Sequence, residues 1–332
     1  MSPGVAPTAT VPQSWGSSAR ALGWAVARRL TRVLVVVWAA ATVGFIALMV
    51  VPGDPVDIML GVQAQVSDSV REQIRADWGM DSPPFLQYLE YMGRLLQGDL
   101  GESYQLRSPV VEVISQQIVP TLQLSGAAAL LAGVMAYSAA LLGRGQKTKK
   151  VISLVELVVI SSPTFWIGLL LLAVFAFQLG WFPVLSTAGV ASLVLPALTL
   201  ALPVAGIISQ VLRQGLDSAE GQPFATTAKS RGLTPAMLVS RHTLRHAAMD
   251  TLTLSGFLVG SLLGGTVLVE TVFARPGLGQ VVIRAIIGRD LPVILGVIVL
   301  SAMVFAVINL VVDLSYQALD PRLRSSQAKE RS

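Results

Sequence analysis

Few side chains in this 332-residue chain have the types and spacing that catalysis or metal binding requires. The two histidines, His242 and His246, are four residues apart, so a helix would place both imidazoles on one face, where they could bind zinc or nickel. The glutamate that accompanies such a pair in metalloproteases is missing, and Arg241 and Arg245 are close by. We therefore interpret this segment as a polar surface and expect no metal site.

The residues of nucleotide and nucleophilic chemistry are also missing. The chain has no cysteine, which excludes disulfides, thiolate metal ligands and cysteine nucleophiles. No lysine directly follows a glycine, so there is no phosphate-binding P-loop. Carboxylates and nucleophiles form no constellation typical of an enzyme. We expect no catalytic residues and no cofactor bound by this chain.

A few polar residues and prolines lie within or near long apolar segments instead. An ionised side chain at the centre of a bilayer costs at least about 2.5–3.5 kcal/mol, so such groups usually face protein or water. Glu156 and Glu270 lie near segment ends, where snorkelling or a salt bridge explains either one. Glu270, Asn309 and Pro163 are candidates to line a pathway. Pro163 should also bend its helix, which helix packing explains equally well.

The elements that must position these residues are membrane helices. Hydrophobic residues make up 53% of the chain and charged residues 13%, against about 25% charged in soluble domains. The mean hydropathy is +0.67. Six apolar segments can each cross a hydrocarbon core of about 30 Å, which predicts an all-α integral membrane protein. They are residues 33–51, 118–142, 151–177, 191–212, 251–269 and 292–314.

Lys and Arg placement predicts the orientation of these spans. With the N-terminus inside, 17 of the 24 Lys and Arg residues fall on the cytoplasmic side, so both termini are expected there. The net charge of +5 is thus explained by membrane orientation, and we expect contact with lipid and none with nucleic acid. Gly256, Gly260 and Gly264 form a small-residue face that could meet a partner subunit or pack within this chain.

Two segments between spans are long enough to have structure of their own. In the outer one, residues 52–117, Asp81-Ser82-Pro83 offers a helix cap, helical spacing of apolar residues follows, and Gly98 can end the helix. In the inner one, residues 213–246, Pro223 suits a helix start and Gly232 a left-handed end. Thr234-Pro235 would then begin a second helix.

Several motifs, in order along the chain, resemble those of the dipeptide/oligopeptide/nickel permease family of ABC importers, with the likeness extending over residues 28–324. The subunit that it resembles is the first, or B-type, permease. The motifs are Val51-Pro52-Gly53-Asp54-Pro55, Gly79-Met80-Asp81-Ser82-Pro83, Gln97-Gly98-Asp99-Leu100-Gly101, Ser162-Pro163-Thr164-Phe165-Trp166, Val269-Glu270-Thr271-Val272-Phe273, Pro276-Gly277-Leu278-Gly279, Asp313-Leu314 and Leu319-Asp320-Pro321-Arg322.

The inner segment resembles the ATPase-coupling motif of this family, in which Glu-Ala-Ala is followed by three residues and Gly. This chain has Thr226-Thr227-Ala228 and then Gly232, so the acidic first position is missing, and the Arg-Thr-Ala common in the peptide branch is absent too. The resemblance assigns ATPase coupling to Thr226, Thr227, Ala228, Lys229, Ser230, Arg231, Gly232, Leu233 and Thr234.

The resemblance implies a type I importer permease in the bacterial inner membrane, without enzyme activity. It would form the translocation pathway with a second homologous permease. Two ATPase subunits that bind ATP and Mg would grip the coupling helices, and an extracytoplasmic binding protein would deliver the substrate. The favoured substrates are peptides, and the alternative within the family is nickel or a metal chelate. An alternative of a different class is a self-sufficient secondary transporter. The expected division is a cytoplasmic extension (1–27), the first span with its outer loop (28–117), a five-helix core (118–316) with the coupling loop 213–246, and a cytoplasmic tail (317–332).

Overall fold

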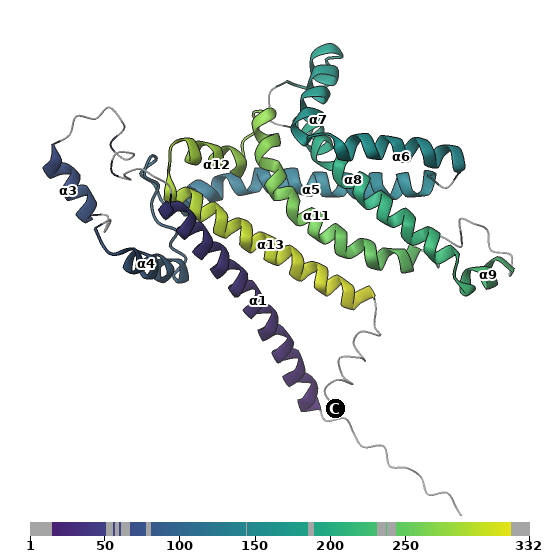
Figure 1. Ribbon diagram of the computed structural model, residues 1–332, viewed down its shortest axis with the longest axis horizontal. Coiled ribbons are helices and arrows are strands. Elements are labelled where there is room, and N and C mark those ends of the chain that lie inside the picture. Colours follow the sequence, from purple (N-terminus) through teal and green to yellow (C-terminus); the bar gives the residue numbers. More distant parts are fainter. Residues whose placement is uncertain are drawn as a thin grey trace, which may run out of the picture.

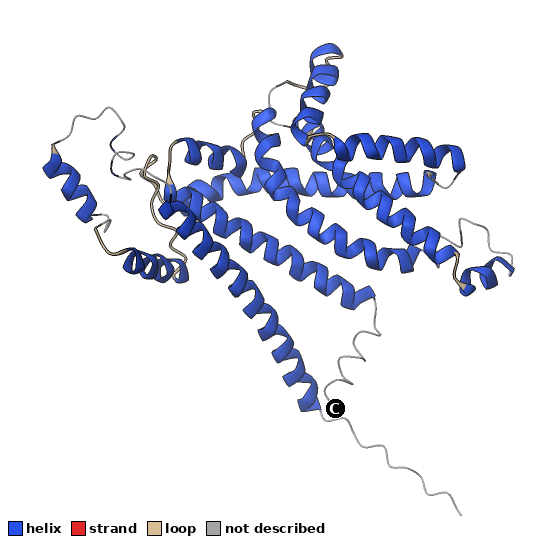
Figure 2. Cartoon of the chain, in the orientation of Figure 1, coloured by secondary structure: helices blue, strands red, loops and turns tan. Residues whose placement is uncertain are grey.

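The computed structural model of the chain is helical, and in the part that it describes the one β pairing is an isolated bridge between Glu102 and Pro109 (Figure 2). Within that part, five helices are long and apolar enough to cross a membrane, which fits the expected all-α membrane class. They are α1 (Trp15–Val50), α5 (Val110–Leu142), α8 (Ala191–Glu220), α11 (Leu244–Val272) and α13 (Leu291–Leu319). The structure describes residues 15–50, 56, 60, 67–77, 81–143, 145–184, 189–230, 237 and 244–319.

The third expected span, residues 151–177, is broken into two helical pieces. Helix α6 (Gln146–Ser161) is followed by α7 (Thr164–Leu171) and the π-helix η1 (Leu172–Gln178), and the two parts are bent by 108°. Proline disfavours the helical conformation of the residue before it, and Ser162 is extended at ψ 137°. Pro163 is extended as well, at ψ 134°. The bend predicted at Pro163 is confirmed, and it is sharp enough to separate the helices.

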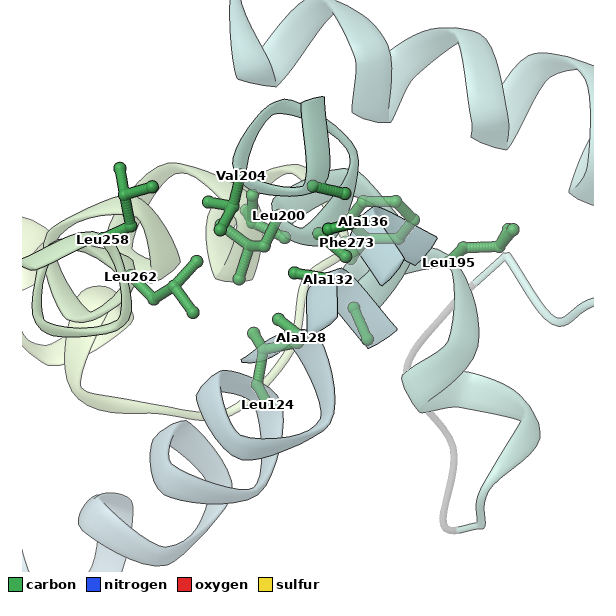
Figure 3. Packing of buried hydrophobic residues seen from close by; sticks show 14 of the residues in the cluster. Leu124, Ala128, Ala132, Ala136, Leu195, Leu200, Val204, Leu258, Leu262 and Phe273 are labelled. Carbon is green, nitrogen blue, oxygen red and sulfur yellow. The ribbon is translucent and has the colours of Figure 1, made fainter. Parts of the chain in front are cut away.

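Helix α8 lies at the centre of the bundle, packed against α5, α6, α7 and α11 (Figure 1). Small side chains at every fourth position let α5 approach it closely, which favours helix association where lipid competes with protein for apolar contacts. Figure 3 shows Leu200 and Val204 of α8 beside Ala132 of α5 and Leu262 of α11. The small residues of α5 are Ala128, Ala132, Ala136 and Ala140, each at most 1% exposed.

The glycine face of α11 packs within the chain. A Cβ atom at Gly256 would overlap Val312, and one at Gly260 would lie 2.6 Å from a ring carbon of Phe305, both on α13. At Gly264 nothing lies within 4 Å. Packing of α11 on α13 inside one subunit therefore accounts for the first two glycines.

The outer segment contains two further helices, α3 (Asp68–Asp77) and α4 (Pro84–Leu96), and α4 confirms the amphipathic helix expected there. No side chain caps it, so the expected cap from Asp81-Ser82 is wrong. Pro84 begins the helix, at a position where a backbone N–H would have no acceptor within the helix. Gly98, at φ +77°, lies just beyond its end, as expected. Tyr91 is buried and stacks on Phe45 of α1, with ring centroids 5.7 Å apart. Helix α4 is thereby packed on the C-terminal end of α1.

Candidate coupling helix and the junctions that hold it

The candidate coupling helix α9 (Pro223–Ser230) is attached to the end of α8 by a two-residue turn. Helix α8 runs to Glu220, eight residues beyond the apolar segment 191–212 that predicted it. Its end turns through Gly221 and Gln222, whose carbonyl accepts a hydrogen bond from Ala225 N at 3.0 Å. The predicted helix start at Pro223 is confirmed.

One face of α9 is buried, and another, called the open face here, is exposed to solvent. Ala225 is fully buried, whereas Thr227 and Ser230 are exposed. Residues three apart on a helix lie on the same face, so these two hydroxyl-bearing residues share the open one. Thr227 Oγ1 donates to Pro223 O at 3.1 Å, and Ser230 Oγ donates to Thr227 O at 3.1 Å. This face is therefore polar and exposed to solvent.

The other residues assigned to coupling fall into two groups. Thr226, Ala228 and Lys229 belong to α9 by their backbone. The remaining ones lie outside the described residues, as does the expected second helix start at Thr234-Pro235. They are Arg231, Gly232, Leu233 and Thr234.

A buried ion pair joins α8 to α6 a few turns before α9 begins. The guanidinium of Arg213 pairs with the carboxylate of Glu156 on α6, and the two side chains are 7% and 6% exposed. Gly143 closes the end of α5 beside them, and a Cβ there would lie 2.8 Å from Arg213 Nη1. The salt-bridge interpretation of Glu156 is confirmed. Arg213, expected in the inner loop, instead lies within α8, where it pairs with α6 and lies beside the end of α5.

A second, exposed pair reinforces the same contact. Lys149 Nζ of α6 lies 2.8 Å from Asp217 Oδ2 of α8, with both side chains at least half exposed. Such pairs contribute at most about 1 kcal/mol. Because Asp217 follows Arg213 by one helical turn, the two pairs hold the same face of α8. The segment that leads into α9 is therefore tied to α6 at two levels.

At the other end of the bundle, Glu270 joins three helices. Its side chain is fully buried, and its Oε2 accepts a hydrogen bond from Gly279 N at 2.7 Å, in the first turn of α12 (Leu278–Ile287). Thr121 of α5 donates to Glu270 Oε1 at 2.6 Å and accepts from Leu278 N at 2.8 Å. A Cβ at Gly277 would overlap the carboxylate. The Pro-Gly-Leu-Gly motif thus lets a carboxylate approach the N-terminus of a helix, where negative charge is favoured.

A second carboxylate, Asp290, ties the outer loop to the start of α13. It is 3% exposed and accepts a hydrogen bond from Ser103 Oγ and one from Tyr104 N at 3.2 Å. Gln105 Nε2 adds a bond to Gly288 O at 2.8 Å. No local sequence pattern marks Asp290 or Thr121, because their partners are more than a hundred residues away.

The candidate pathway residues are not brought together. Glu270 is enclosed in its junction, and Pro163 is exposed at the break between α6 and α7. Asn309 of α13 donates from Nδ2 to Phe305 O at 2.9 Å and lines a pocket between α13 and α1. Their role in a pathway stays a prediction. Of the histidine pair, His242 lies outside the described residues; elsewhere in the described part no group of three or more His, Cys, Asp or Glu could hold a metal ion.

Two family descriptions match the chain. One, the inner membrane component of binding-protein-dependent transport systems, matches residues 106–325, and the N-terminal part of such membrane components matches residues 23–125. A glutathione transport system permease protein of Escherichia coli is 33% identical over 304 residues, covering 90% of this chain and 98% of the relative. A di/tripeptide transport system permease protein of Pseudomonas aeruginosa is 34% identical over 330 residues, with the same coverage.

The fold is also that of a solved transporter chain. A structure of the MetNI methionine ABC transporter matches with a TM-score of 0.53 and 19% identity, covering 62% of this chain and 96% of that chain. The matched families together extend from residue 23 to residue 325 and include the candidate membrane spans of the described residues, of which the first is Ala27–Val50. The chain therefore belongs to the family of inner membrane components of binding-protein-dependent transport systems and is a multi-pass permease.

Proposed function

We propose that this chain is one of two permease subunits of an ATP-driven importer of short peptides in the bacterial inner membrane. The names of its relatives, a glutathione permease and a di/tripeptide permease, support a peptide substrate. Both termini are on the cytoplasmic side, the bent pair α6/α7–η1 forms one of six spans, and the 52–117 segment with α3 and α4 faces outward. The lysine and arginine distribution supports that orientation.

The observation that carries the proposal is the direct continuation of α8 into α9. A motor that grips α9 can move the bundle only if the connection to the spans is stiff. The turn between the helices has two residues, and Arg213 and Asp217 tie the last turns of α8 to α6. Movement of α9 is then transmitted to α8, the helix at the centre of the core.

The remaining parts are supplied by partners. Two ATPase subunits bind ATP and Mg and dock on the coupling helices, one on this chain and one on a second, homologous permease. The two permeases form the pathway between them, and an extracytoplasmic binding protein delivers substrate to the outer face. Closing of the motor rocks the subunits and opens the pathway to the other side, as in other helical transporters.

The test is co-purification after expression with the neighbouring transport genes. In one variant, Thr227→Glu and Ser230→Glu place two negative charges on the open face of α9. We expect this variant to keep the second permease and lose the ATPase subunits, because the charges alter only the docking face. The control is Ser115→Glu, at an exposed serine near the start of α5, which should keep all partners.

Uptake by the intact complex tests the substrate. Labelled dipeptide should accumulate in proteoliposomes that contain the binding protein and ATP. Accumulation of nickel in place of the dipeptide would identify the metal alternative. If the wild-type chain purifies alone and transports without ATPases, the proposal is wrong and a secondary transporter takes its place.

A further inference from the structure

A pocket of about 320 Å³ lies between the middle of α1 and the second half of α13. Figure 1 shows α1 beside α13 at the edge of the bundle. The lining combines two guanidinium groups and one amide with apolar side chains. It consists of Arg29, Arg32, Val33, Val36, Phe305, Ala306, Asn309 and Leu310.

The depth of the pocket matches the inner edge of a membrane. Helix α1 ends at Val50, 18 residues after Arg32 and 21 after Arg29. At about 1.5 Å per residue these arginines lie about 27 and 32 Å from that end, so they reach the boundary of a hydrocarbon core about 30 Å thick. In the proposed orientation this boundary is the inner one, where lipid headgroups begin.

The charge of the two helices favours an anion. Helix α1 contains four arginines and no acidic residue, and the only acidic residue of α13 is Asp313. Arg29 is half-buried in the pocket, and among the lining residues whose side chains the structure describes none is a carboxylate. The Asn309 amide is oriented by its bond to Phe305 O and adds a polar group on the opposite wall.

The rest of the lining favours an acyl chain over a soluble ion. Val33, Val36 and Phe305 continue the pocket from the arginines toward the membrane centre, next to the exposed Leu34 and Val35 of α1. An inorganic phosphate would leave this apolar wall uncovered, whereas a phospholipid covers it and places its phosphate at the guanidinium groups. Basic pockets between membrane helices on the cytoplasmic side are suited to such headgroups.

We propose that the α1–α13 pocket binds an anionic phospholipid of the inner leaflet. Its phosphate contacts Arg29 and Arg32, and one acyl chain lies along Val33, Val36 and Phe305. The lipid fills the space between the two helices and so holds α1 on the core. This site depends on the proposed orientation of the chain and not on its substrate.

The experiment measures lipid retained by the purified complex. The complex is placed in nanodiscs of phosphatidylethanolamine with phosphatidylglycerol, extracted into detergent, and analysed by native mass spectrometry. We expect phosphatidylglycerol to be retained in preference to phosphatidylethanolamine. Arg29→Gln plus Arg32→Gln should weaken retention by about fivefold for each arginine, since one such residue near anionic lipid contributes about 1 kcal/mol.

Two matched variants separate the pocket from charge in general. Arg28→Gln removes a neighbouring arginine that does not line the pocket, and it should leave retention unchanged. Arg29→Lys plus Arg32→Lys keeps both charges and should retain most of the preference. Gel filtration of each variant shows whether the complex is still assembled, so that lost lipid is not confused with lost folding.

Several outcomes would overturn the proposal. Equal retention of both lipids, or equal losses in the Arg28 variant and the double variant, would show a general surface charge. Release of the lipid by glycerol 3-phosphate would identify a site for soluble phosphates. Absence of retained lipid, together with loss of the second permease from the glutamine double variant, would make this face a contact between subunits. None of these outcomes depends on transport activity. A failure of the lipid site can therefore be distinguished from a failure of the proposed transport function.

Discussion

Arg213 of α8 and Glu156 of α6 form an ion pair inside the helix bundle, ten residues before α9 begins. The pair joins two helices that are separated by 57 positions in the sequence. Its contribution to the free energy of unfolding differs in origin from that of the exposed pair between Lys149 and Asp217, because buried charges lose their hydration. The Arg213–Glu156 pair therefore fixes how α8 sits on α6, whether or not it adds net stability.

Removing one partner of this pair should destabilise the protein strongly. Arg213→Met leaves the Glu156 carboxylate buried without its counterion, which costs about 3–5 kcal/mol. Replacing both residues, by Arg213→Met and Glu156→Leu, removes both charges, and we expect most of the stability to return. The measurement is the free energy of unfolding in detergent for the two single variants and the double variant. A double variant as unstable as the single ones would contradict this account.

A methyl group at the end of α5 should disturb the same junction. In Gly143→Ala the new Cβ would lie 2.8 Å from Arg213 Nη1 and 3.0 Å from Ala139 O, so the guanidinium or the helix end has to move. We expect a loss of about 1–3 kcal/mol in the free energy of unfolding.

The control for this substitution lies in the same helix. Gly133 has nothing within 4 Å of a Cβ position, and Gly133→Ala should stabilise α5 by about 0.5–1 kcal/mol. Thermal unfolding of the two variants side by side compares the same chemical change at a crowded and an open position. Equal effects at both positions would show that Arg213 does not need the space at Gly143.

The sequence predicts where apolar helices lie better than where helices end. Hydropathy marks residue 212 as the end of a span because polar residues follow, yet α8 continues to Glu220. A helix does not end where lipid ends, since its backbone hydrogen bonds are satisfied internally on both sides of the boundary. Pro163 and Pro223, in contrast, act on the local backbone, and the bend and the helix start predicted from them are confirmed.

The junctions between distant residues could not be predicted in the same way. Glu270 and Thr121 are 149 positions apart, and neither residue type nor spacing indicates that they meet. A glutamate near the end of a span suggests a snorkelling side chain or a pathway group, which is how the sequence presents Glu270. Only the approach of α5, α11 and α12 encloses its carboxylate.

Glu270→Gln should weaken the junction of α5, α11 and α12. The amide keeps one acceptor and turns an NH₂ group toward either Gly279 N or Thr121 Oγ1. In the first case the Gly279 N–H loses its acceptor, and in the second the Thr121 hydroxyl proton loses its acceptor. An unsatisfied buried group costs about 1–3 kcal/mol. The control is Thr271→Val at the adjacent, exposed position, where the hydroxyl bonds only to Val267 O of its own helix. Unfolding measurements should show a clear loss for the first and little change for the second; a neutral Glu270→Gln would contradict the capping role.

The outer loop offers a test by titration. The pKa of Tyr104 is raised, mainly by burial and further by the nearby negative charge of Asp290. Arg94 acts in the opposite direction and lowers it. Asp290→Asn removes the second cause, so Tyr104 should ionise at a lower pH than in the wild type. Ser103→Ala removes a hydrogen bond to Asp290 but keeps its charge, and should leave the pKa of Tyr104 raised. Difference absorbance of tyrosinate against a Tyr104→Phe variant measures the shift.

Tyr91 should ionise late in the same titration, because burial and Tyr88 raise its pKa from 10.0 to about 12. A phenol whose pKa is higher in the folded state stabilises that state below pH 10.0, and this contribution is lost as the pH rises toward 12. Stability of the wild type should therefore fall over this interval more steeply than that of Tyr91→Phe. Removal of the Asp290 charge acts on the loop and not on the stack of Tyr91 with Phe45. An Asp290→Asn protein in which both tyrosines shift together would show that the loop and α4 move as one unit.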